Sequence, residues 1–456
     1  MTTEITTLVG DGMLVPCVDG TERPYLSLDA GASTGALPNV LARVDAFIET
    51  YSSVHRGAGF KSQASTSAYE DAREAALAFA QRGPDDVAIF VRNTTEAINH
   101  LAYRLDLGPN DVVATTVVEH HANLLPWRRL AHCRYVDVGP DGTFSVDEVA
   151  AVLDAEPRPR LLAITGASNV TGWLPPIDAI IDAAHERGIP VFVDAAQLAP
   201  HRPMPRHADF VAWSGHKMYA PFGAGVLIGP REAFTHGDPF LAGGGAVDLV
   251  DLDEVVWTDP PDREEAGSPN VVGAVALHAA IDRLSEIGWP AIVDHEEQLA
   301  RQLREGLASI AGVRLLGPEL DVPTLAVGTF VVEGMAHALV AARLSAEFGI
   351  GVRHGCFCAH PYLLKLLDLS PVEVERYRAD VIAGDRRRIP GAVRASCGIN
   401  TTTADVSRFL EALGKIVSGE PSPIEYHQDQ HTGDYWPDAP GWTDATRAVG
   451  ASCARG

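Results

Sequence analysis

The sequence Ala208-Asp-Phe-Val-Ala-Trp-Ser-Gly-His-Lys217 is an apolar run that ends in a polar tetrad. Residues 210–213 predict a buried strand, and Ser214 and Gly215 predict the break that follows it. Lys217 therefore stands at the carboxyl end of a strand, the edge where open α/β sheets bind ligands. A partly buried amine there can lose its proton and attack carbonyl compounds, although a single lysine in such a loop is more often a surface residue.

The segment Pro190-Val-Phe-Val-Asp-Ala-Ala-Gln197 predicts a second buried strand, which carries Asp194 and Gln197 to the same edge. A buried carboxylate is costly unless a cation lies beside it. The pyridinium nitrogen of pyridoxal phosphate (PLP) is such a cation, and this cofactor needs a lysine for its Schiff base and an aspartate at its ring nitrogen. Lys217 and Asp194 together therefore predict a PLP site.

Three motifs in order carry a family resemblance: Val118-Glu-His-His-Ala-Asn123, Val193-Asp-Ala-Ala-Gln197 and Ser214-Gly-His-Lys217. Together they resemble the cysteine desulfurase and selenocysteine lyase group of the class V aminotransferases, from about Tyr25 to about Leu413. The resemblance implies an α/β protein with the fold-type I architecture of PLP-dependent transferases. In that architecture a mostly parallel sheet forms the large domain and a smaller α+β domain follows. The resemblance also implies a homodimer that acts on an amino acid.

Predicted strands alternate with amphipathic helices in the first part of the chain, which indicates a mostly parallel sheet covered on both faces. Near Trp289 the pattern changes to long helices and short strands. We therefore divide the chain into four parts. They are an N-terminal arm (residues 1–24), a large PLP-binding domain (25–288), a small C-terminal domain with the cysteine loop (289–418) and an extended tail (419–456).

The composition is that of a soluble globular protein, because 46% of the 456 residues are hydrophobic and 21% are charged. The net charge of −24 argues against nonspecific binding to nucleic acid or anionic membranes, which need clustered lysines and arginines. No apolar run reaches the roughly 18 residues of a membrane-spanning helix, and the N-terminus lacks the pattern of a signal peptide. We therefore expect a cytoplasmic protein whose six cysteines are reduced thiols.

A polar turn follows another predicted strand, residues 86–92, and opens the next helix at Asn93-Thr-Thr-Glu-Ala-Ile98. Backbone N–H groups and the helix dipole at such a start attract a phosphate, and the hydroxyls of Thr94 and Thr95 can donate to it. Helix capping is the alternative role of these threonines. The resemblance places the 5′-phosphate of PLP at this position.

The resemblance assigns roles to further residues at the sheet edge. His120 matches the histidine that stacks on the pyridine ring, where an imidazole can also move a proton. Asn169 matches the asparagine that approaches the 3′-oxygen of the cofactor and the substrate carboxylate, and Ser268 matches a residue that completes the phosphate site of the partner subunit. The cofactor-binding set that we predict is Thr94, Thr95, His120, Asn169, Asp194, Gln197, Ser214, His216, Lys217 and Ser268.

The segment Val352-Arg-His-Gly-Cys-Phe-Cys-Ala-His-Pro361 lies in the predicted small domain, and by resemblance Cys358 matches the desulfurase nucleophile. Cys356 and Phe357 stand where the nearest group has two histidines. The resulting Gly-Cys-Phe-Cys looks more like the molybdenum cofactor sulfurases, although their additional C-terminal domain has no room here. A Cys-x-Cys pair can also be half of a metal site, but the sequence has no second such pair, and we expect no metal.

Several residues are candidates for substrate binding. Arg394 matches the arginine that grips the substrate α-carboxylate, a task suited to a bidentate guanidinium, and Arg353 is a second candidate. The turn Ala30-Gly-Ala-Ser33 resembles the segment that lines the substrate entrance, and His55 is a candidate to face the active site. Residues 363–390 form a longer connection than the common desulfurases have. This insert either covers the entrance or is a solvated surface helix.

Together these residues predict a PLP-dependent cysteine desulfurase. Lys217 would anchor the cofactor and remove the α-proton of L-cysteine, and the Cys358 thiolate would take the substrate sulfur as a persulfide, leaving L-alanine. The sulfur would then pass to an acceptor, either a protein or a small molecule. One alternative is a selenocysteine lyase, and another is a C–S β-lyase, which gives pyruvate and ammonia without Cys358. A third alternative is a catalytically silent scaffold. The cofactor site argues against it, because such a scaffold has no need to keep the site.

Overall fold

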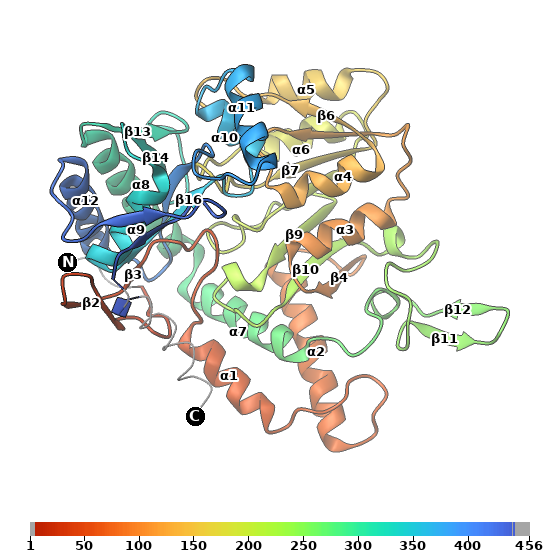
Figure 1. The fold of residues 1–456 in the computed structure, drawn as a ribbon. Coiled ribbons are helices and arrows are strands. Elements are labelled where there is room, and N and C mark those ends of the chain that lie inside the picture. The colour runs from red at the N-terminus through yellow and green to blue at the C-terminus, as the bar shows by residue number, and fades with distance from the viewer. Residues whose placement is uncertain (1–4, 440, 443–456) are drawn as a thin grey trace.

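The computed structural model describes residues 5–439 and 441–442, which form a larger and a smaller half (Figure 1). The larger half is built mainly from the first part of the chain and the smaller half from the C-terminal part. Within the described ranges, no helix combines the length and the hydrophobicity that crossing a membrane requires.

A seven-stranded sheet forms the centre of the larger half. Its strands are β4 (Asp86–Val91), β5 (Val112–Thr116), β6 (His132–Val136), β7 (Leu161–Thr165), β8 (Val191–Asp194), β9 (Phe210–Ser214) and β10 (Gly225–Pro230). They lie in the order β4-β10-β9-β8-β7-β5-β6, and neighbouring pairs are parallel except the two that involve β10. The mostly parallel sheet of the sequence prediction is therefore confirmed.

The apolar run at β9 is buried on both faces of the sheet. Phe210 and Ala212 pack into one core, while Val211 and Trp213 pack into the core on the opposite face. Successive side chains of a strand point to opposite faces, so a strand covered on both sides needs apolar residues at every position. The run ends where the chain turns into the 3₁₀ helix η2 (Gly215–Lys217).

Helices cover both faces of this sheet (Figure 1). They are α1 (Pro38–Ile48), α2 (Phe60–Phe79), α3 (Thr94–Arg104), α4 (Leu125–Leu130), α5 (Val146–Asp154), α6 (Ile177–His185) and α7 (Val271–Ile287). Helix α2 begins at Phe60. Its first turns are rich in serine and threonine, but Ser62 and Ser65 are buried and bond to the preceding loop, which stabilises these turns.

The smaller half contains an antiparallel sheet of β13 (Val313–Leu316), β14 (Val327–Val332), β17 (Ala392–Ser396) and β16 (Arg353–Gly355), in that order. It packs with α8 (Trp289–Ser309), α9 (His337–Phe348) and α12 (Thr403–Val417) around a second core. Leu26 and Leu28 lie in this core, and β3 (Leu26–Ser27) pairs with β15 (Ile350–Gly351). The predicted domain division at residue 288 stays a proposal. The segment around β3 belongs to the predicted large domain but packs against the C-terminal part.

Three hairpins and the insert surround this frame. The hairpins pair β1 (Leu14–Pro16) with β2 (Glu22–Pro24), β11 (Val247–Val250) with β12 (Val255–Trp257), and β18 (Tyr426–Gln428) with β19 (Tyr435–Pro437). The insert, residues 363–390, begins within α10 (His360–Leu366) and contains α11 (Pro371–Ile382), none of whose residues is buried. The predicted tail thus contains the β18–β19 hairpin, while its residues 440 and 443–456 lie outside the described ranges.

Candidate active site

The carboxyl ends of β8 and β9 face a cavity of about 1030 Å³ that extends to the smaller half. Asp194 is the last residue of β8, and Lys217 ends η2 directly after β9. The cavity wall brings together most of the residues predicted from the sequence. They are Thr94, Thr95, His120, Asn169, Asp194, Gln197, Ser214, His216, Lys217, Arg353, Cys358 and Arg394.

Asp194 is a buried carboxylate with few partners. It is 5% exposed, and its Oδ1 accepts one hydrogen bond, from the backbone N–H of Ala196 at 3.0 Å. Burial raises its pKa, while this hydrogen bond and the charge of Lys217 lower it. In the described part of the chain no cationic side chain lies within ion-pair distance of it, so the carboxylate is suited to a cation that a ligand brings.

The Lys217 amine is partly deprotonated near neutral pH. Burial lowers its pKa from 10.5 to about 8, and the negative charge of Asp194 opposes this shift. The neutral amine is the form that attacks a carbonyl carbon. Lys217 therefore offers a nucleophile at a pH where a solvated lysine is almost entirely charged.

The turn between β4 and α3 is the place where the sequence predicts an anion site. The side-chain oxygen of Asn93 caps α3 by accepting a backbone N–H of the first turn at 3.0 Å, so neither threonine is the cap. The backbone N–H and hydroxyl of Thr94 both contact the Ser214 hydroxyl, at 2.8 and 2.7 Å, which ties the helix start to the end of β9. A Cβ at Gly225 would lie 2.7 Å from the Cα of Asn93, so only glycine lets β10 pass this close. The helix start suits a phosphate.

His120 is neutral near pH 7. Its Nδ1 accepts the backbone N–H of Ala122 at 3.0 Å, at the start of η1 (His121–Asn123). Burial lowers its pKa to about 4, and the charge of Lys217 adds to this effect. Because Nδ1 is occupied as an acceptor, the neutral ring carries its proton on Nε2.

Glu119 supports the loop that carries His120, and the sequence motifs gave it no role. Its carboxylate accepts hydrogen bonds from the Thr116 hydroxyl at 2.8 Å, the Asn123 amide at 2.6 Å and the backbone N–H of Thr165 at 3.1 Å. Burial raises its pKa to about 8, against the effect of these bonds. Its place directly before His120 at the end of an apolar strand is the signal that identifies it.

The loop after β16 presents the Cys358 thiol on a strained turn. Phe357 and Cys358 have φ values of 53° and 54°, a region that residues other than glycine seldom occupy. Two hydrogen bonds hold the turn: the Asn169 side-chain amide donates to Phe357 O, and the His121 N–H donates to Cys358 O, both at 2.7 Å. The Cys358 side chain is exposed, so the turn leaves this thiol open to the cavity.

Arg394, on β17, is only 3% exposed and is fixed from two sides. Its Nη1 donates to Asn169 O at 2.8 Å, and its Nη2 donates to Asp29 Oδ1 at 3.0 Å. Its Nε has no hydrogen-bond partner among the described residues. The exposed Arg353 pairs with the other oxygen of Asp29 at 3.5 Å. Two neighbouring guanidinium groups, one with a free N–H, suit a carboxylate.

The end of the cavity beside Asp194 and Lys217, which we call the inner end, fits PLP. Asp194 lacks a cation, the α3 N-terminus is open to an anion, and the Lys217 amine is partly neutral. The pyridinium nitrogen, the phosphate and the aldehyde of PLP supply one group for each of these three places. A single small molecule therefore satisfies the electrostatics of this end of the cavity.

Two further predicted residues on the wall have partners of their own. The Gln197 amide donates to Gly31 O at 2.7 Å, and the His216 Nδ1 lies 3.3 Å from the Ser33 hydroxyl. Burial lowers the pKa of His216. These contacts attach the entrance turn, residues 30–33, to the cofactor side of the cavity.

Three predicted residues do not line the cavity of the single chain: Ala30, His55 and Ser268. Ala30 adjoins the wall, because Gly31 and Ala32 belong to it. Ser268 is exposed in the loop before α7. The proposed role of Ser268 at the site of a partner subunit does not require it to face this cavity.

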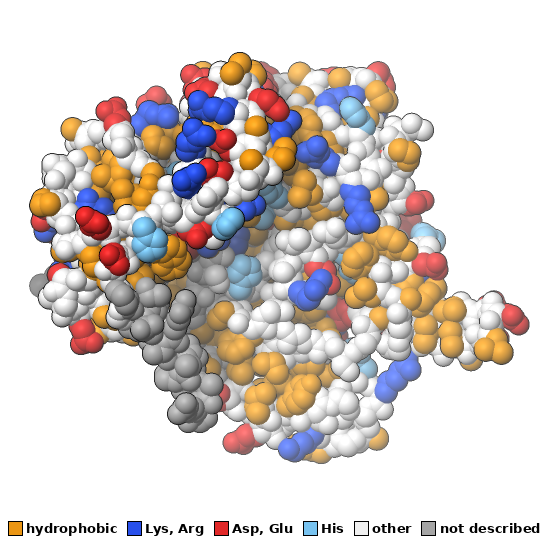
Figure 2. Space-filling model, in the orientation of Figure 1, with side chains coloured by type: hydrophobic (Ala, Val, Ile, Leu, Met, Phe, Trp, Pro, Cys, Tyr) orange, Lys and Arg blue, Asp and Glu red, His pale blue; other side chains and the backbone are white. Residues whose placement is uncertain are grey.

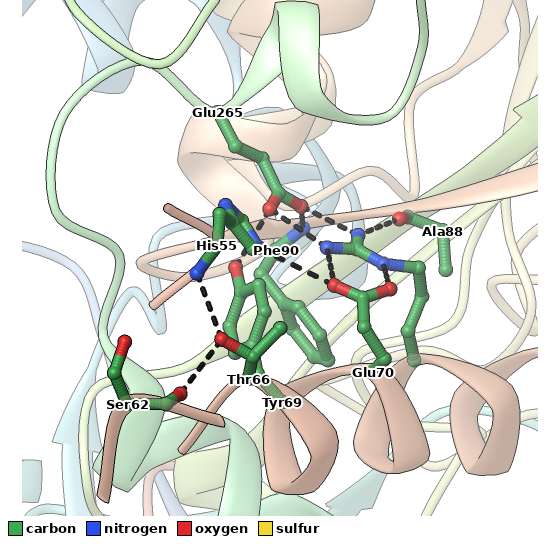
Figure 3. Close-up of polar contacts among 9 residues, drawn as sticks. His55, Ser62, Thr66, Tyr69, Glu70, Ala88, Phe90 and Glu265 are labelled. Atoms are coloured by element: carbon green, nitrogen blue, oxygen red, sulfur yellow. Dashed lines mark hydrogen bonds and ion pairs between the residues drawn. The ribbon is translucent and has the colours of Figure 1, made fainter. Parts of the chain in front are cut away.

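His55 belongs to a separate network around Glu265 (Figure 3). The buried Glu265 carboxylate accepts hydrogen bonds from the Tyr69 hydroxyl at 2.7 Å and from Arg73 at 2.8 and 3.0 Å. The His55 ring lies 3.4 Å from Glu70, a second partner of the same arginine. This network joins α2 to the loop that carries Ser268 and is a structural feature of the larger half.

The comparisons with known proteins agree with this geometry. The aminotransferase class-V family model matches residues 26–409. A cysteine desulfurase of Klebsiella pneumoniae (strain 342) is 34% identical over 407 residues, which cover 86% of this chain and 94% of that protein. A probable cysteine desulfurase of Halalkalibacterium halodurans is 35% identical over 359 residues, 76% of this chain and 87% of that protein.

Solved structures give the same result. The apo cysteine desulfurase of Thermococcus onnurineus NA1 matches with a TM-score of 0.77 and 31% identity, over 87% of this chain and 95% of that one. The cysteine desulfurase CsdA of Escherichia coli matches with a TM-score of 0.73 and 30% identity, over 86% and 95%. The chain therefore belongs to the class-V aminotransferase family, whose members depend on PLP.

Proposed function

We propose that the protein is a PLP-dependent cysteine desulfurase, which converts L-cysteine to L-alanine and passes the sulfur through a Cys358 persulfide to an acceptor. The observation that carries the proposal is the exposed thiol of Cys358 in the same cavity as Lys217 and the buried Arg394. The names of the similar proteins support it, because several are cysteine desulfurases at about 34% identity over most of the chain.

When PLP is bound, its protonated ring withdraws electrons from the α-carbon of the amino acid. Asp194 holds the ring nitrogen in its protonated form, because a buried carboxylate favours a cation beside it. Lys217 would hold the cofactor through its amine and would serve as the base that removes the α-proton, because its lowered pKa of about 8 suits a base that works near neutral pH.

The other residues orient the substrate and move protons. Arg394 binds the α-carboxylate through its free N–H, with Asp29 and the backbone of Asn169 fixing the guanidinium. His120 carries its proton on Nε2 and can donate it inside the cavity. Cys358 attacks the substrate sulfur: a sulfur–sulfur bond forms, the Cβ–S bond breaks, and the carbon skeleton takes up one proton at Cβ and one at Cα and leaves as L-alanine.

A C–S β-lyase is the second candidate, and the size of the cavity favours it. About 1030 Å³ leaves room for a cysteine that carries a substituent on sulfur. Such an enzyme would release pyruvate and ammonia and would not depend on Cys358. A selenocysteine lyase would share the cofactor-binding residues with the desulfurase.

Product analysis of the PLP-loaded protein separates these functions. With a thiol reductant present to release the persulfide sulfur, we expect alanine and sulfide from L-cysteine with the wild type and with Cys356→Ala, a matched control in the same loop, and neither product from Cys358→Ala. Pyruvate and ammonia from all three proteins would make the enzyme a lyase and refute the persulfide step. Comparing L-cysteine with L-selenocysteine as substrates of Cys358→Ala tests the selenocysteine alternative. Release of selenium without this thiol would favour a selenocysteine lyase.

We also propose a homodimer. The β11–β12 hairpin projects from the body (Figure 1), and its Leu249 and Leu252 are 63% and 102% exposed. Apolar side chains on a projecting hairpin are costly in water and suit an interface. The exposed Ser268 loop provides a second contact. Light scattering on the purified protein measures the mass, and a monomer at working concentration would contradict this proposal.

We further propose a cytoplasmic location, because a persulfide on an exposed thiol needs a reducing compartment. The described cysteines, residues 17, 133, 356, 358 and 397, are all free thiols, and Cys453 lies outside the described residues. Fractionation of the source cells tests this location, and recovery of the protein outside the cytoplasm would contradict it.

A further inference from the structure

The cavity has an outer part that the proposed desulfurization does not use. Its wall comes from the insert and the β18–β19 hairpin and includes Arg386, Arg387, Arg388, Gln428 and Asp434. The proposed cofactor and a cysteine would fill the inner end, while the whole cavity of about 1030 Å³ is at the upper end of the sizes that hold drug-sized ligands. The outer part therefore has room for a second small molecule.

Backbone contacts attach the hairpin to the insert. The Arg386 N–H donates to Gln430 O at 2.9 Å, and its guanidinium donates to His431 O at 3.0 Å. The hairpin backbone passes so close that a Cβ at Gly433 would lie 2.5 Å from Arg386 O. The two segments are 45 positions apart, counted from Arg386 to His431, yet they form one wall.

The cysteine loop connects this outer wall to the inner site. At its start, the His354 ring lies 3.4 Å from Asp434 of the hairpin. At its end, the carbonyl of Phe357 accepts the Asn169 amide at 2.7 Å, beside the predicted cofactor and substrate residues. Cys358 follows directly, so its thiol stands where the inner and outer parts of the cavity meet.

The outer wall is positively charged in a protein of net charge −24. Some of its arginines are neutralised nearby: Arg387 pairs with Asp385 at 2.6 Å and Arg388 with Asp380 at 3.1 Å. Arg353 shares Asp29 with Arg394, and Asp434 faces His354. Figure 2 shows lysine and arginine side chains, with acidic ones between them, over the region of α10 and α11 above the hollow.

Two arginines that line the cavity, one in the insert and one on β13, have no acidic partner in the described part of the chain. Arg386 donates to the carbonyl of His431, and Arg314 donates to Leu366 O at 3.3 Å. A carbonyl oxygen fixes a guanidinium in place but does not cancel its charge. Neighbouring His337 adds no charge, because burial lowers its pKa to about 4. Fixed positive charges at the mouth of a cavity attract anions.

We propose that the outer cavity binds the anionic group of the sulfur acceptor, a small thiol with a carboxylate, sulfonate or phosphate. This inference rests on the proposed function. The acceptor thiolate attacks the outer sulfur of the Cys358 persulfide. A bond forms between the acceptor and that sulfur, the bond to the Cys358 sulfur breaks, and Cys358 leaves as a thiolate. The exchange needs no external oxidant or reductant.

The test compares mercaptoethanesulfonate with neutral mercaptoethanol as acceptors, at equal thiolate concentration and saturating L-cysteine, on the PLP-loaded protein. We expect kcat/KM for the sulfonate thiol to be about tenfold higher and the difference to shrink with added salt. Arg386→Gln should lower this preference about threefold, and the double variant with Arg314→Gln about tenfold. Arg378→Gln on α11, which pairs with Glu375 outside the cavity wall, should leave it unchanged.

Two results would overturn the inference: equal use of both thiols by the wild type, or an unchanged preference in the double variant. Sodium sulfate should compete with the thiol and not with L-cysteine, since competition with L-cysteine would assign the anion site to the substrate. Alanine formed in the first turnover, without acceptor, distinguishes a failure of the proposed anion site from a failure of the proposed desulfurization. A normal first turnover in all variants shows intact chemistry, while its absence in the wild type would refute the proposed function itself.

Discussion

Glu265 and Asp194 are both buried carboxylates in the larger half, at 9% and 5% exposure, but their surroundings differ. Glu265 accepts hydrogen bonds from the Tyr69 hydroxyl, two nitrogens of Arg73 and the backbone N–H of Phe90 (Figure 3). Asp194 accepts a single backbone N–H, from Ala196. Glu265 has a cation within ion-pair distance, and Asp194 has none there among the described residues.

This difference indicates which of the two carboxylates stabilises the fold and which serves a ligand. A buried charge that is fully paired contributes to the packing of the elements that it joins, and removing its partner leaves an uncompensated charge. A buried carboxylate with free lone pairs is unfavourable for the empty fold and is retained where a ligand completes it. The number of donors around a buried carboxylate therefore indicates whether its replacement will affect stability or activity.

The largest expected effect is on activity, from Asp194→Asn. The amide keeps the shape of the side chain but cannot hold a cation, so alanine formation should fall about 1,000-fold, the order seen when a preorganised polar group at a reaction centre is lost. The free energy of unfolding of the cofactor-free protein should not fall by more than about 1 kcal/mol. Steady-state kinetics and urea unfolding measure the two. A large loss of stability with full activity would refute the comparison.

Glu265→Gln should have the opposite profile. It leaves the buried Arg73 guanidinium without its carboxylate, so the free energy of unfolding should fall by about 3 kcal/mol, with activity per folded molecule retained. Glu70→Gln is the matched control, because Glu70 pairs with the same arginine at 3.0 Å but is 42% exposed, and should cost less than about 1 kcal/mol. Equal losses for the two variants would show that burial does not decide the strength of these pairs.

The pH dependence of covalent PLP binding tests the protonation state of Lys217 at the inner end of the cavity. Because the pKa of Lys217 is lowered to about 8, its neutral form is present above this pH and is lost as the pH falls below it. The rate at which the cofactor-free protein binds PLP covalently should rise from pH 7 to 8 and then level off. Borohydride reduction followed by mass spectrometry measures this rate, with Lys217→Ala as the blank. A rate that keeps rising to about pH 10 would indicate an ordinary lysine.

The sequence was sufficient for the inner end of the site and insufficient for the outer end. Asp194, Lys217 and Thr94 each lie within four residues after an apolar run, so strand ends in the sequence locate them at one edge of the sheet. The family resemblance then supplied their roles. Local pattern was enough here because a parallel sheet places the carboxyl ends of its strands together.

Long-range pairs could not be predicted in this way. Asp29 meets Arg394 across 365 positions, and Glu265 meets Arg73 across 192. The β18–β19 hairpin comes from a polar segment without clear periodicity, and its position depends on contacts with the insert and with α9. A sequence pattern indicates which face of a helix or strand is apolar, whereas these contacts depend on how elements distant in the sequence pack together.

The smallest expected effect concerns His55, a substrate-binding candidate from the sequence that lies in the Glu265 network (Figure 3). Its φ of 69° favours asparagine as a replacement, because asparagine tolerates the left-handed region. The ring and Glu70 are 27% and 42% exposed, so His55→Asn should lower the free energy of unfolding by less than about 1 kcal/mol. The KM for L-cysteine should stay within about twofold, because the ring lies off the cavity wall of its own chain. A severalfold rise in KM with unchanged stability would instead place His55 at a substrate site, one completed by a second copy of the chain.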